Sequence, residues 1–162
     1  MVIQRMVIQR KILVADDDRI TREMIGAILT RAGHEVVFAE DGQSAVEEAL
    51  SERPDLVFID GLMPKMHGFL ACKAIKELES PPKVILLTGV YTKYSYKFEA
   101  KGSFGADDLL KKPATPDELF ACLEKHLPGT SVGADSPEAS SNDMLVSLRG
   151  DSTLSIATLS NE

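Results

Sequence analysis

Six side chains that could act together on a phosphoryl group each follow a short apolar segment of the chain. They are Asp16, Asp17, Asp18, Asp60, Thr88 and Lys112. Carboxylates that share a pocket repel one another unless a cation or protons intervene, and their oxygens suit Mg²⁺. An ionised carboxylate beside such an ion can attack phosphorus, while a lysine and a hydroxyl hold the phosphoryl oxygens. Gathered at one place, these residues would support phosphoryl transfer.

Each of these residues also has an ordinary structural explanation when taken alone. An acidic triplet such as Asp16–Asp18 is commonly a solvated loop or a helix cap. Asp60 followed by glycine is typical of a turn. Thr88 could simply end a strand, and Lys112 could be a surface lysine. The chemical interpretation therefore depends on a fold that brings the residues together.

The apolar segments predict the strands of a parallel sheet. Continuous apolar runs are typical of parallel strands that are covered on both faces. The predicted strands are Ile12–Ala15, Val36–Ala39, Leu56–Ile59, Val84–Leu87 and, last, Asp108–Lys111. Because ligands of open α/β sheets bind beyond the carboxyl ends of the strands, we expect the six polar side chains to converge on one crevice.

Helical periodicity fills the intervals between these strands. The first helix contains Ile20–Leu29 and stops at Gly33, and the second ends before Pro54. Three more helices are predicted, one over Phe69–Leu78, one between Thr92 and Lys101, and one that starts with a capping box at Thr115–Glu118. Five strands alternating with five helices predict a three-layer α/β domain with a five-stranded parallel sheet.

Composition limits the function classes. The chain has 162 residues, of which 44% are hydrophobic and 27% charged, and its net charge is −7. Acidity argues against direct binding of nucleic acid or an anionic membrane, which require clustered Lys and Arg. No apolar run approaches the roughly 20 residues of a membrane span, and no signal peptide is visible, so we expect a cytoplasmic protein. Cys72 and Cys122 are predicted to be buried free thiols.

The two ends of the chain differ from its middle. Residues 1–5 are repeated as residues 6–10, so we interpret 1–10 as a duplicated or artefactual extension. Residues 11–127 carry the alternating pattern. From 128 to 162 the chain has eleven Ser or Thr, five acidic residues and no aromatic residue, which predicts a weakly structured tail or linker.

Four stretches together resemble the receiver domain of two-component response regulators. The stretches are Lys11–Asp18, Leu56–Gly68 with its Asp60 and Met63-Pro64, Val84–Gly89, and Lys112-Pro113. The resemblance covers about Lys11–Leu127. It implies a flavodoxin-like fold with the strand order 2-1-3-4-5.

The resemblance also implies roles for particular residues. Asp60 matches the residue that becomes the aspartyl phosphate, Thr88 and Lys112 match those that contact the phosphoryl group, and Asp16, Asp17, Asp60 and the backbone carbonyl of Leu62 match the Mg²⁺ site, which Mn²⁺ could also occupy. Within that site, Asp17 would bind the ion directly and Asp16 through a water. Asp18 matches no essential position, and we expect it to cap the first helix.

A receiver domain implies a phosphorylation-dependent switch. A histidine kinase or phosphotransfer protein would supply the phosphoryl group, and the domain would catalyse only its own phosphorylation and dephosphorylation. The added charge would change the face formed by the fourth helix, the fifth strand and the fifth helix. A downstream protein target or an output domain would read that change. Phosphorylation-dependent homodimerisation is a further arrangement that the sequence leaves open.

Three departures from the family pattern affect how the switch would work. Leu109 stands where the family often has an aromatic residue whose rotamer reports phosphorylation. His67 stands where an acidic residue is common, and we expect it to be structural or solvated. Leu62 and Val90, two positions after Asp60 and Thr88, are apolar and cannot orient an attacking water, which predicts slow hydrolysis of the phosphate. The segment Val90–Ser103 is rich in Tyr and Lys, which fits a solvated helix and a partner surface equally.

Two other functions are weighed against this one. A receiver-like binding module that is never phosphorylated would be compatible with Leu109, although the intact acidic residues argue against it. A haloacid-dehalogenase-like phosphatase also uses a strand-end aspartate. Its signature D-x-D-x-[ST] is met by Asp16 and Asp18, but Ile20 occupies the hydroxyl position.

Overall fold

The computed structural model describes residues 8–89 and 100–130. The chain divides into two compact units, one of Gln9–Glu118 and one of Met1–Ile8 with Leu119–Glu162. The described residues of the first unit form a parallel sheet of β1 (Lys11–Ala15), β2 (Glu35–Ala39), β3 (Leu56–Asp60), β4 (Lys83–Thr88) and β5 (Asp108–Lys111). Each predicted strand is confirmed to within one residue at either end.

The strand order is β2-β1-β3-β4-β5, as the resemblance implied. This is the order of the flavodoxin-like fold, in which β2 lies on one side of β1 and the later strands are added on the other side, starting with β3. Ala15 at the end of β1 pairs with Ala39 and with Ile59. Asp60 pairs with Leu87 in β4, one residue before Thr88. The register therefore brings the carboxyl ends of the central strands to one edge of the sheet.

Four helices have described bounds: α1 (Arg19–Arg31), α2 (Gly42–Glu52), α3 (Gly68–Lys76) and α5 (Pro116–His126). The predicted helix between Thr92 and Lys101 lies mostly outside the described residues, of which 100–102 are helical. Asp18 caps α1 by accepting from the backbone N–H of Thr21 at 2.9 Å, which confirms its predicted role. No helix in the described part of the chain has the length and apolarity needed to cross a membrane.

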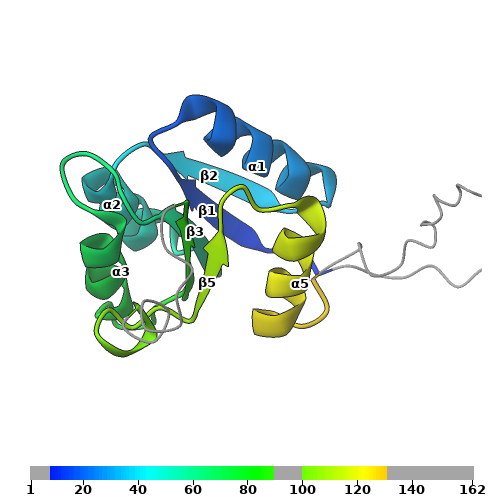
Figure 1. The fold of residues 1–162 in the computed structure, drawn as a ribbon. Coiled ribbons are helices and arrows are strands. Elements are labelled where there is room, and N and C mark those ends of the chain that lie inside the picture. Colours follow the sequence, from blue (N-terminus) through cyan, green and yellow to red (C-terminus); the bar gives the residue numbers. More distant parts are fainter. Residues whose placement is uncertain (1–7, 90–99, 131–162) are drawn as a thin grey trace, which may run out of the picture. The chain divides into compact units, whose positions relative to one another are not determined.

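Helices cover both faces of the sheet in the first unit. Figure 1 shows α1 on one side of the strands, and α2 and α3 side by side on the other. The side chains under α2 and α3 form one buried apolar cluster with alternate residues of the central strands. All four side chains Leu56–Ile59 of β3 are fully buried, as expected for a central strand covered on both faces. Because the apolar side chains of these strands are buried, each strand is held in one position along its length. The polar residue at its end is held at the edge of the sheet as a result.

The start of α5 follows the predicted capping box. The backbone N–H of Thr115 donates to Glu118 Oε1 at 2.9 Å, and the N–H of Glu118 donates to Thr115 Oγ1 at 3.1 Å. Within the second unit, the N–H of Gly129 donates to Glu124 Oε2 at 2.9 Å, which closes the chain after the helix. The predicted tail lies outside the described residues from position 131 onward.

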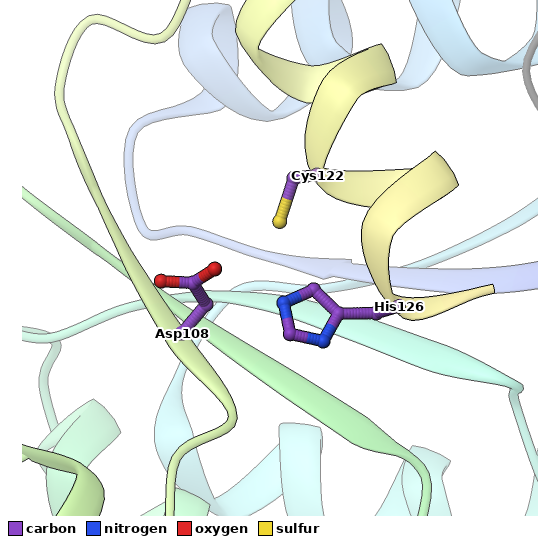
Figure 2. Close-up of side chains that lie close together, drawn as sticks. All are labelled: Asp108, Cys122 and His126. Atoms are coloured by element: carbon purple, nitrogen blue, oxygen red, sulfur yellow. The ribbon is translucent and has the colours of Figure 1, made fainter. Parts of the chain in front are cut away.

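Both cysteines are buried free thiols, as the sequence predicted. Cys72 in α3 donates to the carbonyl oxygen of Phe104 at 3.4 Å, and burial raises its pKa to about 12. A thiol with so high a pKa is a poor nucleophile at neutral pH, so Cys72 is a structural residue. Cys122 lies one turn before His126 on α5, and Figure 2 shows both side chains on the same side of that helix.

Candidate functional site

Four strand ends deliver the predicted site residues to one edge of the sheet. Asp16 directly follows β1, Asp60 is the last residue of β3, and Thr88 is the last residue of β4. Lys112 directly follows β5, and its backbone N–H donates to the carbonyl oxygen of Thr88 at 2.8 Å. The predicted convergence of these residues is therefore observed.

The ammonium group of Lys112 joins two of the carboxylates. Its Nζ donates to Asp16 Oδ2 at 2.8 Å and lies 3.4 Å from Asp60 Oδ2. The side chain of Asp16 is fully buried and that of Asp60 is nearly so. A single lysine therefore balances two buried carboxylates, which leaves the pair with an excess negative charge.

A third carboxylate completes the acidic cluster. Asp16, Asp17 and Asp60 each offer an oxygen, and these three atoms lie within 4.8 Å of one another. Asp17 is exposed, so its side chain faces solvent at the mouth of the site. The backbone N–H of Leu62 donates to Asp60 Oδ1 at 3.3 Å, and half of the Leu62 side chain is exposed above the turn. The arrangement places three hard oxygen donors within reach of one small cation.

Burial and repulsion change the protonation of this cluster. Burial of Asp60, followed by the negative charge of Asp16, raises the pKa of Asp60 to about 6. The charge of Lys112 and the N–H of Leu62 oppose that rise. For Lys112, burial lowers the pKa, but the hydrogen bond and charge of Asp16 outweigh burial and the net shift is upward. Asp60 is thus ionised at neutral pH at a cost that a nearby cation would relieve.

Stability of the metal-free protein should therefore depend on the charge of Asp60. The pKa of Asp60 is about 6 in the folded protein, and its ordinary value is 3.8. As the pH rises, the folded state therefore keeps the proton on Asp60 up to a higher pH than the unfolded state does. The contribution of Asp60 to the free energy of unfolding is therefore lost as the pH rises through about 6. We expect Asp60→Asn to stabilise the protein, by more at pH 8 than at pH 5. Urea unfolding in chelator measures both differences, and a difference that is constant or larger at pH 5 would contradict the prediction.

Thr88 and Leu109 occupy buried positions beside the site. Thr88 is nearly fully buried at the end of β4, and Leu109 is buried in β5 within the apolar cluster under α2 and α3. Leu86 of β4 pairs with Leu109. The position at which the family often has an aromatic ring is therefore filled by an aliphatic core side chain. Val90 and the tyrosines of this segment, for which a solvated helix and a partner surface were equally expected, lie outside the described residues.

Gly68 shapes the turn after Asp60, although no pattern in the sequence singled it out. A Cβ atom on Gly68 would overlap the carbonyl oxygen of Asp60 and approach Gly61 Cα to 3.0 Å. The N–H of Gly68 donates to the carbonyl oxygen of Gly61 at 2.9 Å. Only glycine lets the first residue of α3 lie against the backbone that carries Asp60. His67 precedes it as the N-terminal cap residue of α3, makes no side-chain capping bond and is exposed to solvent, which agrees with the solvated alternative predicted for it.

The loop between Asp60 and α3 is held from α2 as well. A Cβ atom on Gly42 would overlap the carbonyl oxygen of Met66, so α2 starts directly against this loop. Lys65 has a φ of 67°, and its Nζ lies 3.5 Å from Asp41 Oδ2. Asp41 is the N-cap of α2 and accepts from the N–H of Ser44 at 2.7 Å. The loop beside the site is thus held by contacts with the start of α2 as well as with the start of α3.

Three carboxylates, a threonine and a lysine thus lie at the carboxyl edge of a sheet with the flavodoxin-like strand order. The family described as "Response regulator receiver domain" matches residues 12–124. The chain belongs to this family, the receiver domains of two-component systems.

Individual relatives agree with this assignment. The chain is 30% identical over 135 residues to the alkaline phosphatase synthesis transcriptional regulatory protein PhoP of Bacillus subtilis (strain 168). The matched region covers 83% of this chain and 55% of PhoP. It thus spans about half the length of that curated relative. The chemotaxis response regulator CheY4 of Vibrio cholerae has a similar structure, with a TM-score of 0.68 and 32% identity over 74% of this chain and all (100%) of that chain.

A second similar structure was solved with an ion. It is the receiver domain of the sensor histidine kinase PA1611 from Pseudomonas aeruginosa PAO1, with a magnesium ion coordinated in its active site cleft. The TM-score is 0.66 and the identity 27%, over 74% of this chain and 98% of that chain. The two proteins therefore share the fold that, in this chain, brings the acidic cluster together.

Proposed function

We propose that this receiver domain accepts a phosphoryl group on Asp60 and acts as a phosphorylation-dependent switch. The observation that carries the proposal is the contact of Lys112 Nζ with both Asp16 and Asp60 at the carboxyl edge of the sheet. An oxygen of Asp17 lies within 4.8 Å of an oxygen of each of these two carboxylates. The donor would be a phosphohistidine of a histidine kinase or phosphotransfer protein. An oxygen of Asp60 forms the new P–O bond as the P–N bond of the donor breaks.

The carboxylates fit a divalent cation. Asp16, Asp17 and Asp60 supply hard oxygen donors, and the raised pKa of Asp60 reflects a repulsion that a cation would remove. We propose that these residues, with the backbone carbonyl of Leu62, hold Mg²⁺, or Mn²⁺ in its place. Bound there, such an ion would neutralise charge on the phosphoryl oxygens.

Two further residues would handle the transferred group. Lys112 is fixed by Asp16 next to Asp60, so its ammonium is placed to pair with a phosphoryl oxygen. Thr88 is brought to the same edge by the bond between its carbonyl and the Lys112 N–H. We propose that the Thr88 hydroxyl binds the phosphoryl group once it is attached. The domain would catalyse only its own phosphorylation and dephosphorylation, through Asp60, Thr88 and Lys112.

Acetyl phosphate tests this function without the natural donor. With Mg²⁺, intact mass spectrometry should show one added phosphoryl group per chain, and chelator should abolish the addition. A wild-type protein that gains no phosphoryl group would favour a receiver-like module that is never phosphorylated. Steady turnover of a generic phosphate ester such as p-nitrophenyl phosphate would instead favour a haloacid-dehalogenase-like phosphatase.

We predict that the aspartyl phosphate is long-lived because Leu62 offers no group to orient a water. Half of the Leu62 side chain is exposed at the turn after Asp60. Leu62→Asn should shorten the half-life by about tenfold, since an amide can hold an attacking water. The measurement is loss of the phosphoryl group after removal of acetyl phosphate.

Leu70→Asn is the matched control for this measurement, because Leu70 is equally exposed but lies on α3. Its half-life should equal that of the wild type. A wild-type half-life of seconds in Mg²⁺ buffer, or equal half-lives for Leu62→Asn and the wild type, would refute the prediction.

We propose that residues 11–127 form the receiver domain, that 1–10 are an extension, and that 128–162 are a tail or linker.

We also propose how the switch acts on a partner. A phosphoryl group adds a charge of about −1.5 to −2, which would bias the face of the fourth helix, β5 and α5 towards a protein target, an output domain or a second copy. Leu109 is aliphatic, so an aromatic rotamer at that position would not be the signal. We place this function in the cytoplasm, without nucleic acid or membrane contact by this chain.

A further inference from the structure

Asp16 is held by hydrogen bonds at every polar atom. Its N–H donates to the carbonyl of Ala39 at 3.1 Å, and its Oδ1 accepts from the N–H of Asp18 at 2.8 Å. Its Oδ2 accepts from Lys112 Nζ at 2.8 Å. Its carbonyl oxygen accepts from Nη1 of Arg22 at 2.6 Å. Because β1 ends at Ala15 and α1 begins at Arg19, this carbonyl lies in the turn between two elements, and a side chain supplies its donor.

Arg22 is well placed to hold this turn. It lies in the first turn of α1, where its own N–H donates to the carbonyl of Asp18 at 2.9 Å. Its guanidinium reaches back over the turn to Asp16. The same side chain is therefore anchored to the helix at one end and to the strand exit at the other. A charge-assisted bond of 2.6 Å is among the stronger hydrogen bonds in proteins.

We propose that Arg22 is a positioning residue for the cation site of Asp16, Asp17 and Asp60. By fixing the carbonyl of Asp16, it fixes the direction in which the carboxylates of Asp16 and Asp17 leave the turn. This inference rests on the proposed function, because it concerns the cation that the three carboxylates would hold. Arg22 would act through its bond to the backbone carbonyl of Asp16, a carboxylate-bearing residue.

The sign of the effect separates positioning from simple charge. Arg22 carries a positive charge near the site, and its charge is felt at the neighbouring carboxylate of Asp18. If it acted only through that charge, its removal would strengthen cation binding. If it acts by holding the turn, its removal weakens cation binding, because the carboxylates lose their fixed arrangement. The two mechanisms thus predict opposite changes in the dissociation constant.

The test is the binding of Mg²⁺ alone to the full chain, measured by isothermal titration calorimetry. Arg22→Met should raise the dissociation constant about tenfold, in line with the loss of other groups that orient metal ligands. Arg22→Lys keeps the charge and a donor, and should remain within about threefold of the wild type. Arg19→Met is the matched control, because Arg19 is exposed on the same helix and pairs with Glu23 at 2.8 Å. Its dissociation constant should be unchanged or lower.

A second measurement needs no ion. In the chelated protein, the amide of Asp18 should exchange its hydrogen about tenfold faster in Arg22→Met, because its acceptor Asp16 Oδ1 is less firmly placed. Arg19→Met should exchange as the wild type does. Thermal unfolding checks that the variants are folded. If Arg22→Met does not fold, Arg22→Ala replaces it, since alanine also lacks a donor to the Asp16 carbonyl, and an unchanged dissociation constant and exchange rate for that variant overturn the inference.

Failure of this inference is distinguishable from failure of the proposed function. If the wild type binds Mg²⁺ and Arg22→Met binds it equally or more tightly, Arg22 is not a positioning residue and the cation site stands. If the wild type binds no Mg²⁺, the cation site itself is refuted and the role of Arg22 falls with it.

Discussion

Asp60→Asn should gain no phosphoryl group when it is incubated with acetyl phosphate and Mg²⁺, while the wild type gains one. Asparagine has nearly the same shape as aspartate, and its oxygen can still accept the N–H of Leu62 that Asp60 Oδ1 accepts at 3.3 Å. The amide lacks the ionised oxygen that attacks phosphorus, so the chemistry is lost without loss of the fold. We expect a decrease of at least about a thousandfold in the rate of addition, the scale reported by removal of a nucleophile.

Asp55→Asn is a suitable control for this variant. Asp55 precedes β3 at the opposite end of the strand, where its Oδ2 accepts from the N–H of Lys11 at 2.9 Å. Its phosphorylation should match the wild type. An adduct on Asp60→Asn equal to that of the wild type would show that another residue accepts the phosphoryl group.

Gly68→Ala should destabilise the domain strongly. The added Cβ would overlap the backbone carbonyl oxygen of Asp60, and the two residues are held in place as the last residue of β3 and the first residue of α3. Relief requires α3 to move away from β3 and the bond from the Gly68 N–H to the Gly61 carbonyl to lengthen from 2.9 Å. Overpacking of this kind costs about 3 kcal/mol or more in the free energy of unfolding. For a domain of this size that corresponds to a decrease of about 10 °C in Tm.

Gly102→Ala separates this effect from a general response to losing glycine. Among residues 8–89 and 100–130, no atom lies within 4 Å of the position that its Cβ would occupy, so its Tm should equal or slightly exceed that of the wild type. Thermal unfolding followed by circular dichroism compares the three proteins. A Gly68→Ala variant within about 2 °C of the wild type would contradict the predicted clash.

The strands and the convergence of Asp16, Asp60, Thr88 and Lys112 could be predicted because each depends on local sequence. A continuous apolar run predicts a buried parallel strand, and the polar residue that follows it must then lie at the carboxyl edge of the sheet. The capping box at Thr115 is likewise local, since its two partners lie three residues apart.

The residues that were missed act across segments that are distant in the chain. Gly68 matters because it lies against the carbonyl of Asp60, and Gly42 because it lies against Met66. Neither contact leaves a periodic or charge pattern, so a glycine that starts a helix is indistinguishable by sequence from one in open space. Arg22 could have been noticed as a cation close to an acidic turn, but only the structure shows that it bonds the carbonyl of Asp16.

Reductive trapping of the phosphorylated protein identifies the residue that carries the phosphoryl group. Borohydride reduces an aspartyl phosphate to homoserine, and peptide mass spectrometry then locates the modified position in the wild-type chain. We expect homoserine at position 60 after treatment with acetyl phosphate and Mg²⁺, and none without Mg²⁺. Homoserine at position 16 or 17 in place of 60, or at no position despite intact protein, would contradict the assignment of Asp60 as the phosphoryl acceptor.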